Sequence, residues 1–172
     1  MKNILVIGGA GYVGNEIIKY FLKRNIKVTC LDNLIYNQKF KLKHRLLNFL
    51  KLDITKKKEI KKISGFYDTV LILAGLVGDP ITKKYKSLSI KVNENAIINI
   101  INYFNEKKRC NKLFFISNCS NYGLVKKNIK IKETAPLKPL SLYAKSKVKI
   151  EKLLLRKKKN LFNPTIFRFA TA

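Results

Sequence analysis

Histidine and cysteine, which supply most metal ligands and many catalytic groups, are scarce in this chain of 172 residues. The single histidine, His44, lies in a lysine-rich stretch, so neither a Ser-His-Asp triad nor a site of several histidines is expected. The three cysteines, Cys30, Cys110 and Cys119, are an odd number without CxxC spacing. They indicate neither a disulfide framework nor a zinc site, and we expect free, mostly buried thiols and no metal.

Long hydrophobic runs are also missing. No apolar run approaches the roughly 20 residues that span a bilayer, and the N-terminal segment NILVIGG lacks the basic region and cleavage site of a signal peptide. We therefore expect a cytoplasmic protein without a membrane span. A hydrophobic content of 47% over this length is enough for one folded domain with a substantial core.

Acidic residues are few, because 10 Asp and Glu face 37 Lys and Arg and give a formal net charge of +27. Such a charge ordinarily suggests nucleic acid or an anionic membrane as partner. Here the basic residues are spread from Lys19 to Lys159, and no aromatic or glycine-rich pattern is interleaved with them to stack on bases. A dispersed charge produces a long-range electrostatic field but no defined binding site. We therefore favour compositional drift over a selected polyanion site as the origin of the charge, and nucleic acid is not the expected partner.

Six short apolar runs are present. They are rich in Ile, Val, Leu and Phe without clean alternation, as in parallel strands that are buried on both faces. Amphipathic segments with helical spacing lie between them, for example Ile17, Ile18, Phe21 and Leu22. This alternation predicts an α/β fold with a doubly wound parallel sheet. The expected strands are 4–8, 27–32, 48–54, 68–75, 112–117 and 164–170.

Three glycines, Gly8, Gly11 and Gly14, lie where the first expected strand turns into a helix. In that setting the first glycine permits the tight turn, the second lets the backbone approach a pyrophosphate, and the third lets the helix pack closely on the strand. Asp32 ends the second strand and is placed to accept hydrogen bonds from both adenosine ribose hydroxyls, which favours NAD over NADP. Asp53, after the third strand, either lies near the adenine or is a helix N-cap-like residue before Thr55.

With these residues in place, the chain resembles the extended short-chain dehydrogenase/reductase superfamily. In particular it is similar to the NAD-dependent epimerase/dehydratase family, which acts on nucleotide sugars. The resemblance covers essentially all of residues 1–172 and is carried by seven motifs. They are GGAGYVG at 8–14, LDNL at 31–34, LDI at 52–54, LILAGLVGDP at 71–80, VNENA at 92–96, FFISNCSNYG at 114–123 and ETAPLKPLSLYAKSK at 133–147.

The resemblance implies a Rossmann fold that binds NAD, with Tyr143 as catalytic acid/base and Lys147 as its partner. Tyr143 would remove a proton from a sugar hydroxyl while hydride leaves the same carbon, and return of hydride to the other face would give the epimer. Asn93 would support the active site. The implied cofactor-binding residues are Gly8, Gly11, Tyr12, Val13, Gly14, Asp32, Asn33, Asp53, Ile54, Leu73, Ala74, Gly75, Asn93, Tyr143 and Lys147.

The pattern Tyr-x-x-x-Lys occurs three times, at 103–107, 122–126 and 143–147, so its setting must decide between them. Only the last lies beyond the fifth expected strand, where Ser141 is a good N-cap and both side chains fall on one face of the following helix. A tyrosine has a pKa of about 10. An ammonium one helical turn away favours the phenolate, so we expect the pKa of Tyr143 to lie closer to neutral pH.

The sequence departs from the family pattern at Asn118, where members carry Ser or Thr to hydrogen-bond the reacting oxygen. An amide donates such a bond but cannot relay a proton. Ser117 points to the other face of the strand, and Ser120 is expected to cap a loop. Cys119 and Ser120 also replace the Asp-Glu pair of the dehydratases, which favours epimerase-like or reductase-like chemistry. Cys119 is expected to be a small buried residue.

Family members are roughly twice as long, and their later half binds the nucleotide sugar. The resemblance therefore covers the NAD-binding half, and the substrate-binding part is not in this chain. An incomplete reading frame, a degraded gene and a chain completed by a second polypeptide all fit this length. A catalytically inactive NAD-binding or scaffold protein is the alternative function. The helices after the fourth and fifth strands commonly pair two subunits in the family, so a homodimer is possible.

Overall fold

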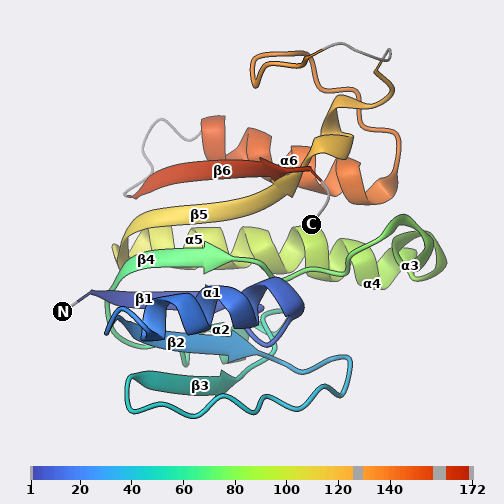
Figure 1. Cartoon of the computed structure of the whole chain (residues 1–172). Helices are drawn as coiled ribbons and strands as arrows, with labels where there is room; N and C mark the ends of the chain where they lie inside the picture. Colours follow the sequence, from blue (N-terminus) through green and yellow to red (C-terminus); the bar gives the residue numbers. More distant parts are fainter. Residues whose placement is uncertain (1, 126–129, 157–161, 171–172) are drawn as a thin grey trace.

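The computed structural model describes residues 2–125, 130–156 and 162–170. Six strands and a series of helices alternate along most of the chain (Figure 1). The strands are β1 (Asn3–Ile7), β2 (Lys27–Asp32), β3 (Leu47–Lys51), β4 (Tyr67–Ile72), β5 (Cys110–Asn118) and β6 (Asn163–Phe169). The helices are α1 (Tyr12–Leu22), α2 (Lys57–Ile60), α3 (Asp79–Lys84), α4 (Lys86–Ile90), α5 (Ile97–Lys107) and α6 (Leu142–Arg156), with a π-helical turn η1 (Lys91–Ala96) and a 3₁₀ turn η2 (Cys119–Tyr122).

All six strands form one parallel sheet in the order β3-β2-β1-β4-β5-β6. Each strand coincides with one of the six apolar runs, so the predicted fold class is confirmed. The central strands β1 and β4 are buried on both faces, which explains why their sequences do not alternate. The fourth run extends past its strand, because β4 ends at Ile72 and Leu73–Gly75 turn out of the sheet.

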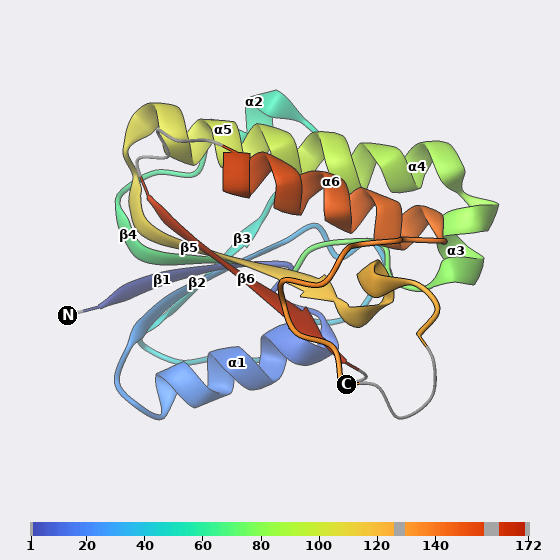
Figure 2. The same ribbon diagram turned by 90° about the horizontal axis from the view of Figure 1, so that it is seen from above.

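The helices lie in two layers on opposite faces of the sheet (Figure 2). α1 lies alone on one face, where Ile18 and Leu22 pack against Val6, Val28 and Cys30. α2, α4, α5 and α6 lie on the other face over the larger hydrophobic core. In the part of the chain that the structure describes, no helix is both long and apolar enough to cross a bilayer.

The segment between β2 and β3 differs from the expected alternation of strand and helix. Residues 33–46 cross from one parallel strand to the next without a helix. Lysines at 39, 41 and 43 alternate with Phe40 and Leu42, which pack against the α1-side core. A period of two cannot form the apolar stripe of a helix, so the segment runs extended over the sheet edge.

β1 and β4 are neighbours in the sheet, while the chain after β1 goes to one face and the chain after β4 to the other. The loops that leave the carboxyl ends of these two strands therefore separate. In a doubly wound sheet this divergence opens a crevice, and ligands bind there.

Candidate functional site

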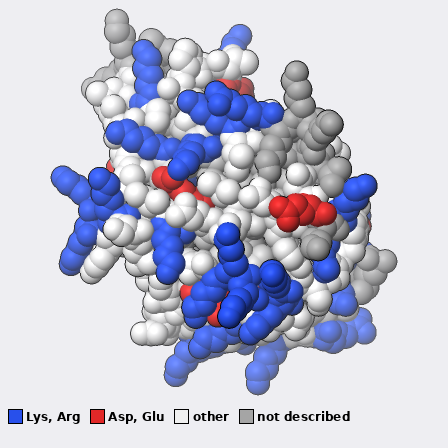
Figure 3. All heavy atoms as spheres, turned by 180° about the vertical axis from the view of Figure 1, so that it is seen from behind, with Lys and Arg blue, Asp and Glu red and all other residues white. Residues whose placement is uncertain are grey.

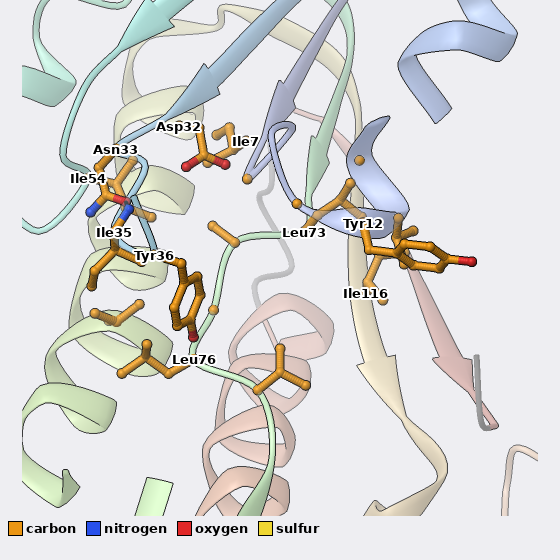
Figure 4. A pocket seen from close by; sticks show the side chains of 18 of the residues that line it. Ile7, Tyr12, Asp32, Asn33, Ile35, Tyr36, Ile54, Leu73, Leu76 and Ile116 are labelled. Atoms are coloured by element: carbon orange, nitrogen blue, oxygen red, sulfur yellow. Dashed lines mark hydrogen bonds between the residues drawn. The ribbon is translucent and has the colours of Figure 1, made fainter. Parts of the chain in front are cut away.

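A cavity of about 760 Å³ lies at the carboxyl ends of the strands and is lined by residues of β1, β2, β5 and α6 together with the loop that follows β4 (Figure 4). Asp32, Ile35 and Tyr36 lie on one side of the view, and Tyr12 and Ile116 on the other. The structure brings together nearly every predicted site residue here. Lining the cavity are Gly8, Gly11, Tyr12, Val13, Gly14, Asp32, Asn33, Asp53, Ile54, Leu73, Ala74, Gly75, Asn118, Tyr143 and Lys147.

The three glycines of the first turn meet different surroundings. Gly8 has a φ of +83°, and a Cβ there would lie 2.5 Å from the Ala74 amide nitrogen. A Cβ on Gly14 would lie 2.6 Å from the Cα of Gly9, so this glycine lets α1 pack against the turn. A Cβ on Gly11 would meet nothing closer than the Gly8 carbonyl oxygen, at 3.5 Å. Packing therefore requires the first and third glycines, whereas the second faces open space in the cavity.

The N-terminus of α1 opens onto the same space. Its N-cap, Gly11, has no side chain to accept a hydrogen bond from the first turn, and that turn contains no acidic residue. The unpaired N–H groups and the helix dipole therefore attract an anion. Tyr12, the first helical residue, borders the cavity and is 84% exposed.

Asp32 joins the glycine turn to the end of β2. Its Oδ2 accepts a hydrogen bond from the Ala10 N–H at 3.0 Å, and its Oδ1 accepts one from the Leu34 N–H at 2.8 Å. Each carboxylate oxygen has a further lone pair. The side chain is buried, yet it borders the cavity (Figure 4). Asp32 thus fixes the backbone around it and keeps acceptor capacity toward a ligand.

Asp53 has a local partner as well. Its Oδ1 accepts a hydrogen bond from the Thr55 N–H at 2.9 Å, which closes a turn after β3. α2 begins only at Lys57, so Asp53 caps this turn and not the helix. Ile54, beside it, is buried and lines the cavity on the same side as Asp32.

Asn93 is the one predicted cofactor residue that does not line the cavity. Its side chain is 2% exposed and holds the loop after β4 from behind. The amide accepts a hydrogen bond from the Leu76 N–H at 2.8 Å and donates to the Leu76 carbonyl and to Ser89 Oγ. It lies in the π-helical turn η1, which brings it within reach of the loop. Asn93 therefore shapes the cavity wall at Gly75 without bordering the cavity itself.

Tyr143 and Lys147 lie one turn apart at the start of α6, where the Ser141 hydroxyl caps the helix by accepting the Ala144 N–H at 3.2 Å. Lys147 is 5% exposed, and its Nζ donates to the Ile116 carbonyl at the end of β5, at 2.8 Å. The same Nζ lies 5.4 Å from the centre of the Tyr143 ring. α6 thus presents both groups to the carboxyl end of β5.

The expected lowering of the Tyr143 pKa is not found, because its pKa is raised. Burial raises the pKa of Tyr143, the nearby Asn118 amide offsets part of that rise, and Asp79 adds to it. Burial lowers the pKa of Lys147 to about 8, with Glu151 acting in the opposite direction. The Lys147 ammonium is directed at the Ile116 carbonyl and at the face of the Tyr143 ring, not at the Tyr143 hydroxyl. Desolvation of Tyr143 therefore raises its pKa by more than the ammonium lowers it.

Comparisons with known proteins agree with this arrangement. Residues 4–172 match the model of the NAD dependent epimerase/dehydratase family. The chain belongs to that family. UDP-glucose 4-epimerase 2 of Oryza sativa is 30% identical over 164 residues, which cover 88% of this chain and 39% of that protein. UDP-glucose 4-epimerase of Lactobacillus helveticus is 30% identical over 155 residues, 88% of this chain and 46% of its own.

Solved structures give the same result. UDP-glucose 4-epimerase of Thermus thermophilus in complex with NAD has a TM-score of 0.86 and 25% identity, and the match covers 96% of this chain and 54% of that one. UDP-N-acetylglucosamine 4-epimerase of Methanobrevibacter ruminantium in complex with UDP-N-acetylmuramic acid has a TM-score of 0.86 and 26% identity. That match covers 97% of this chain and 54% of the other. The chain thus spans about half or less of the length of these family members.

Asn118, the departure from the family pattern, borders the cavity next to Tyr143. Neither polar atom of its amide has a hydrogen-bond partner in the described parts of the chain, although both atoms are shielded from solvent. Its neighbour Ser117, expected to point to the other face of the strand, also lines the cavity, where it is buried and accepts a hydrogen bond from Asn121 at 2.8 Å. Cys30 and Cys110 are buried as predicted, but Cys119 is exposed at the cavity, which corrects the expectation for that residue.

The other two Tyr-x-x-x-Lys tyrosines lie outside the cavity. The Tyr103 hydroxyl donates to the Ile63 carbonyl on the α5 side of the core. The Tyr122 hydroxyl accepts a hydrogen bond from Arg168 at 2.8 Å. Lys126, the partner of Tyr122 in the pattern, lies outside the described residues. Selection of the 143–147 pair by its setting therefore agrees with the geometry.

Sequence reasoning missed two groups of cavity residues. Ile35, Tyr36 and Gln38 come from the segment after β2, and Phe169 and Ala170 come from the end of β6. The first group carries no motif, because its position depends on an extended crossover that was expected to be helical. The second group had an available signal, since the carboxyl end of β6 meets the same sheet edge as the glycine turn.

Proposed function

We propose that this chain binds NAD in the cavity and provides the NAD-binding and proton-transfer half of a nucleotide-sugar epimerase. One observation carries the proposal. A single cavity runs from the open position at Gly11 and the Asp32 carboxylate to the buried Tyr143 and Lys147 pair. A dinucleotide that extends from one to the other would place its adenosine beside Asp32 and its nicotinamide beside the pair.

The residues present fit NAD. The space at Gly11 and the uncapped α1 N-terminus suit a pyrophosphate, which is anionic and needs close backbone approach. The free lone pairs of Asp32 suit ribose hydroxyls, and its negative charge disfavours a 2′-phosphate. NAD, when bound, supplies a hydride acceptor and donor.

The chain's own groups would handle the proton and the oxygen. Tyr143, whose pKa is raised by burial, holds its proton at neutral pH and suits donation to a ketone oxygen. Lys147 retains a positive charge below pH about 8 and has two further N–H donors besides the one bound by Ile116. The Asn118 amide lies close enough to Tyr143 to lower its pKa, and neither of its polar atoms has a hydrogen-bond partner of good geometry in the described residues, so the amide suits a hydrogen bond to the same oxygen.

A nucleotide sugar is the proposed substrate. The relatives and structural neighbours named above are UDP-sugar 4-epimerases, and one of them is solved with UDP-N-acetylmuramic acid. Because the chain spans about half of their length, groups that grip the sugar nucleotide are proposed to come from polypeptide that this sequence does not include. Pairing of two copies through the α5 and α6 faces is part of the same proposal.

Isothermal titration calorimetry with NAD tests the first step. Saturable binding below millimolar NAD supports the proposal, and a folded sample that shows no heat at millimolar NAD refutes it. Glu16→Gln is the matched variant, because Glu16 is exposed and does not line the cavity, and it should bind NAD like the unmodified chain. Turnover of UDP-glucose tests the second step, and binding without turnover in any assembled form would favour the inactive NAD-binding alternative.

A further inference from the structure

A buried polar cluster lies directly behind the Tyr143 and Lys147 pair. It consists of Ser117, Asn121, Tyr122, Glu151 and Arg168, hereafter the Glu151 cluster. These residues come from β5, η2, α6 and β6, so four elements meet in it. None of them lies among the predicted site residues, and Glu151 does not border the cavity.

Glu151 is the centre of the cluster. It is 1% exposed, and both of its oxygens accept hydrogen bonds from the Arg168 guanidinium, at 2.7 to 3.2 Å. Oε1 also accepts the Asn121 amide at 2.7 Å, and that amide donates to Ser117 Oγ at 2.8 Å. A buried carboxylate is costly unless it is fully paired, so the charge of Glu151 depends on Arg168 and Asn121.

The cluster touches each part of the proposed proton-transfer site. Glu151 follows Lys147 by one turn on α6, on the same helix face. Asn121 anchors η2, the turn that begins directly after Asn118. Ser117 precedes Asn118 on β5, next to the Ile116 carbonyl that binds Lys147. A change at Glu151 therefore acts on the turn that carries Asn118 and on Lys147 together.

We propose that Glu151 is a positioning residue for this site. Through Asn121 it fixes the turn that carries Asn118, and across one turn of α6 its carboxylate, balanced by Arg168, sets the electrostatic environment of Lys147. The inference rests on the proposed function for its catalytic meaning. The arrangement of charges that it asserts can be measured without NAD or substrate.

The charged and titratable groups around Lys147 are few. α6 contributes Tyr143 and Glu151, and β6 contributes Arg168 through its pairing with Glu151. On η1, Glu94 is turned away, because it accepts Ser146 and pairs with Lys149. From the loop after β4, uncharged Gly75 faces the Lys147 Nζ, and β5 provides the Ile116 carbonyl and the Phe115 ring.

The experiment measures how readily Lys147 reacts with an amine-directed acylating reagent between pH 6 and 10, with the modified peptide quantified by mass spectrometry. Glu151→Gln removes the negative charge and leaves Arg168 unbalanced, so the midpoint of Lys147 reactivity should shift to lower pH. Arg168→Met leaves the Glu151 charge unbalanced, so the midpoint should shift to higher pH. A purely structural role would loosen the site in both variants and would not give shifts of opposite sign.

The exposed pair of Glu16 and Lys19 provides the matched control, and Glu16→Gln should leave the Lys147 midpoint unchanged. Because either single variant leaves a buried charge unpaired, the double variant Glu151→Gln/Arg168→Met keeps the test decidable, and its midpoint should lie between those of the two single variants. Shifts of the same sign, or no shift in folded variants, would overturn the proposal. Absence of NAD binding in the unmodified chain would instead count against the proposed function alone.

Discussion

Substitution of Gly11 by alanine separates a ligand-binding role of the glycine turn from a folding role. Gly11 has a φ of −73° and a ψ of 173°, which any residue adopts. The new Cβ would lie 3.5 Å from the Gly8 carbonyl oxygen, an ordinary van der Waals contact. Removing a glycine restricts the unfolded chain, which favours folding by about 0.4–1 kcal/mol. Alanine is a poorer N-cap than glycine by a similar amount, so the free energy of unfolding should change by less than about 1 kcal/mol.

NAD binding, in contrast, should weaken. The added methyl group projects into the space where the pyrophosphate would approach the backbone. Overpacking by one methyl group typically costs about 1–3 kcal/mol, which corresponds to a dissociation constant roughly 5- to 150-fold larger. Calorimetry with NAD measures the affinity, and chemical denaturation followed by circular dichroism measures the stability.

Gly8→Ala and Gly14→Ala are the matched controls. Both place a Cβ within 2.7 Å of backbone atoms, and Gly8 also has a positive φ, so both should lower the free energy of unfolding by roughly 1–3 kcal/mol or more. The reasoning fails if Gly11→Ala destabilises the fold as much as these two. It also fails if Gly11→Ala binds NAD as tightly as the unmodified chain.

Three further predictions concern other cavity residues. Asp32→Asn should reduce the preference for NAD over NADP by roughly tenfold, which corresponds to the loss of one charge-assisted hydrogen bond. An unchanged ratio of the two dissociation constants in calorimetry would exclude the contact between Asp32 and the ribose. Asn118→Ser should keep or raise the melting temperature, because it removes a buried amide whose polar atoms have no partner, and should raise any epimerase turnover; a large drop in melting temperature would show that the amide is needed. Burial lowers the pKa of Lys147 from 10.5 to about 8, so the folded chain binds fewer protons than the unfolded chain between these values, and the stability contributed by this group should rise across that window. Denaturation of the chain and of Lys147→Met from pH 7 to 10.5 measures the difference, and a stability gap that is independent of pH would contradict the shift.

The sheet was predictable because its strands are buried on both faces. Such strands must be largely apolar, and β1 and β4, which end at Ile7 and Ile72, show no alternation of polar and apolar residues that would indicate a strand with one exposed face. The crossover of residues 33–46 was not predictable in the same way. Its path depends on Phe40 and Leu42 docking on the α1-side core, a tertiary contact that replaces the local helical period.

The site was predictable where backbone conformation restricts residue type, and less so where a side chain acts through its partners. Gly8 and Gly14 are required by close backbone contacts, which leave a sequence signature. The pKa of Tyr143 depends on burial and on the direction of the Lys147 ammonium, and spacing along a helix specifies neither. Cys119 is exposed because β5 ends at Asn118, so Cys119 is the first residue of the 3₁₀ turn η2 and not a buried strand residue.

The few acidic residues of the chain help to explain its high positive charge. Most of them have an internal partner: Asp32, Asp53, Asp68 and Glu59 accept backbone N–H groups, while Glu94 and Glu151 accept buried or paired side chains. Lysine and arginine, by contrast, are spread over the surface, as the rear face in Figure 3 shows. Loss of surface acids raises net charge without cost to the fold, whereas loss of these six would remove hydrogen bonds that the turns and helices need. The charge of +27 is therefore spread over many side chains, and it attracts an anionic dinucleotide as a long-range field without contributing to its recognition in the cavity.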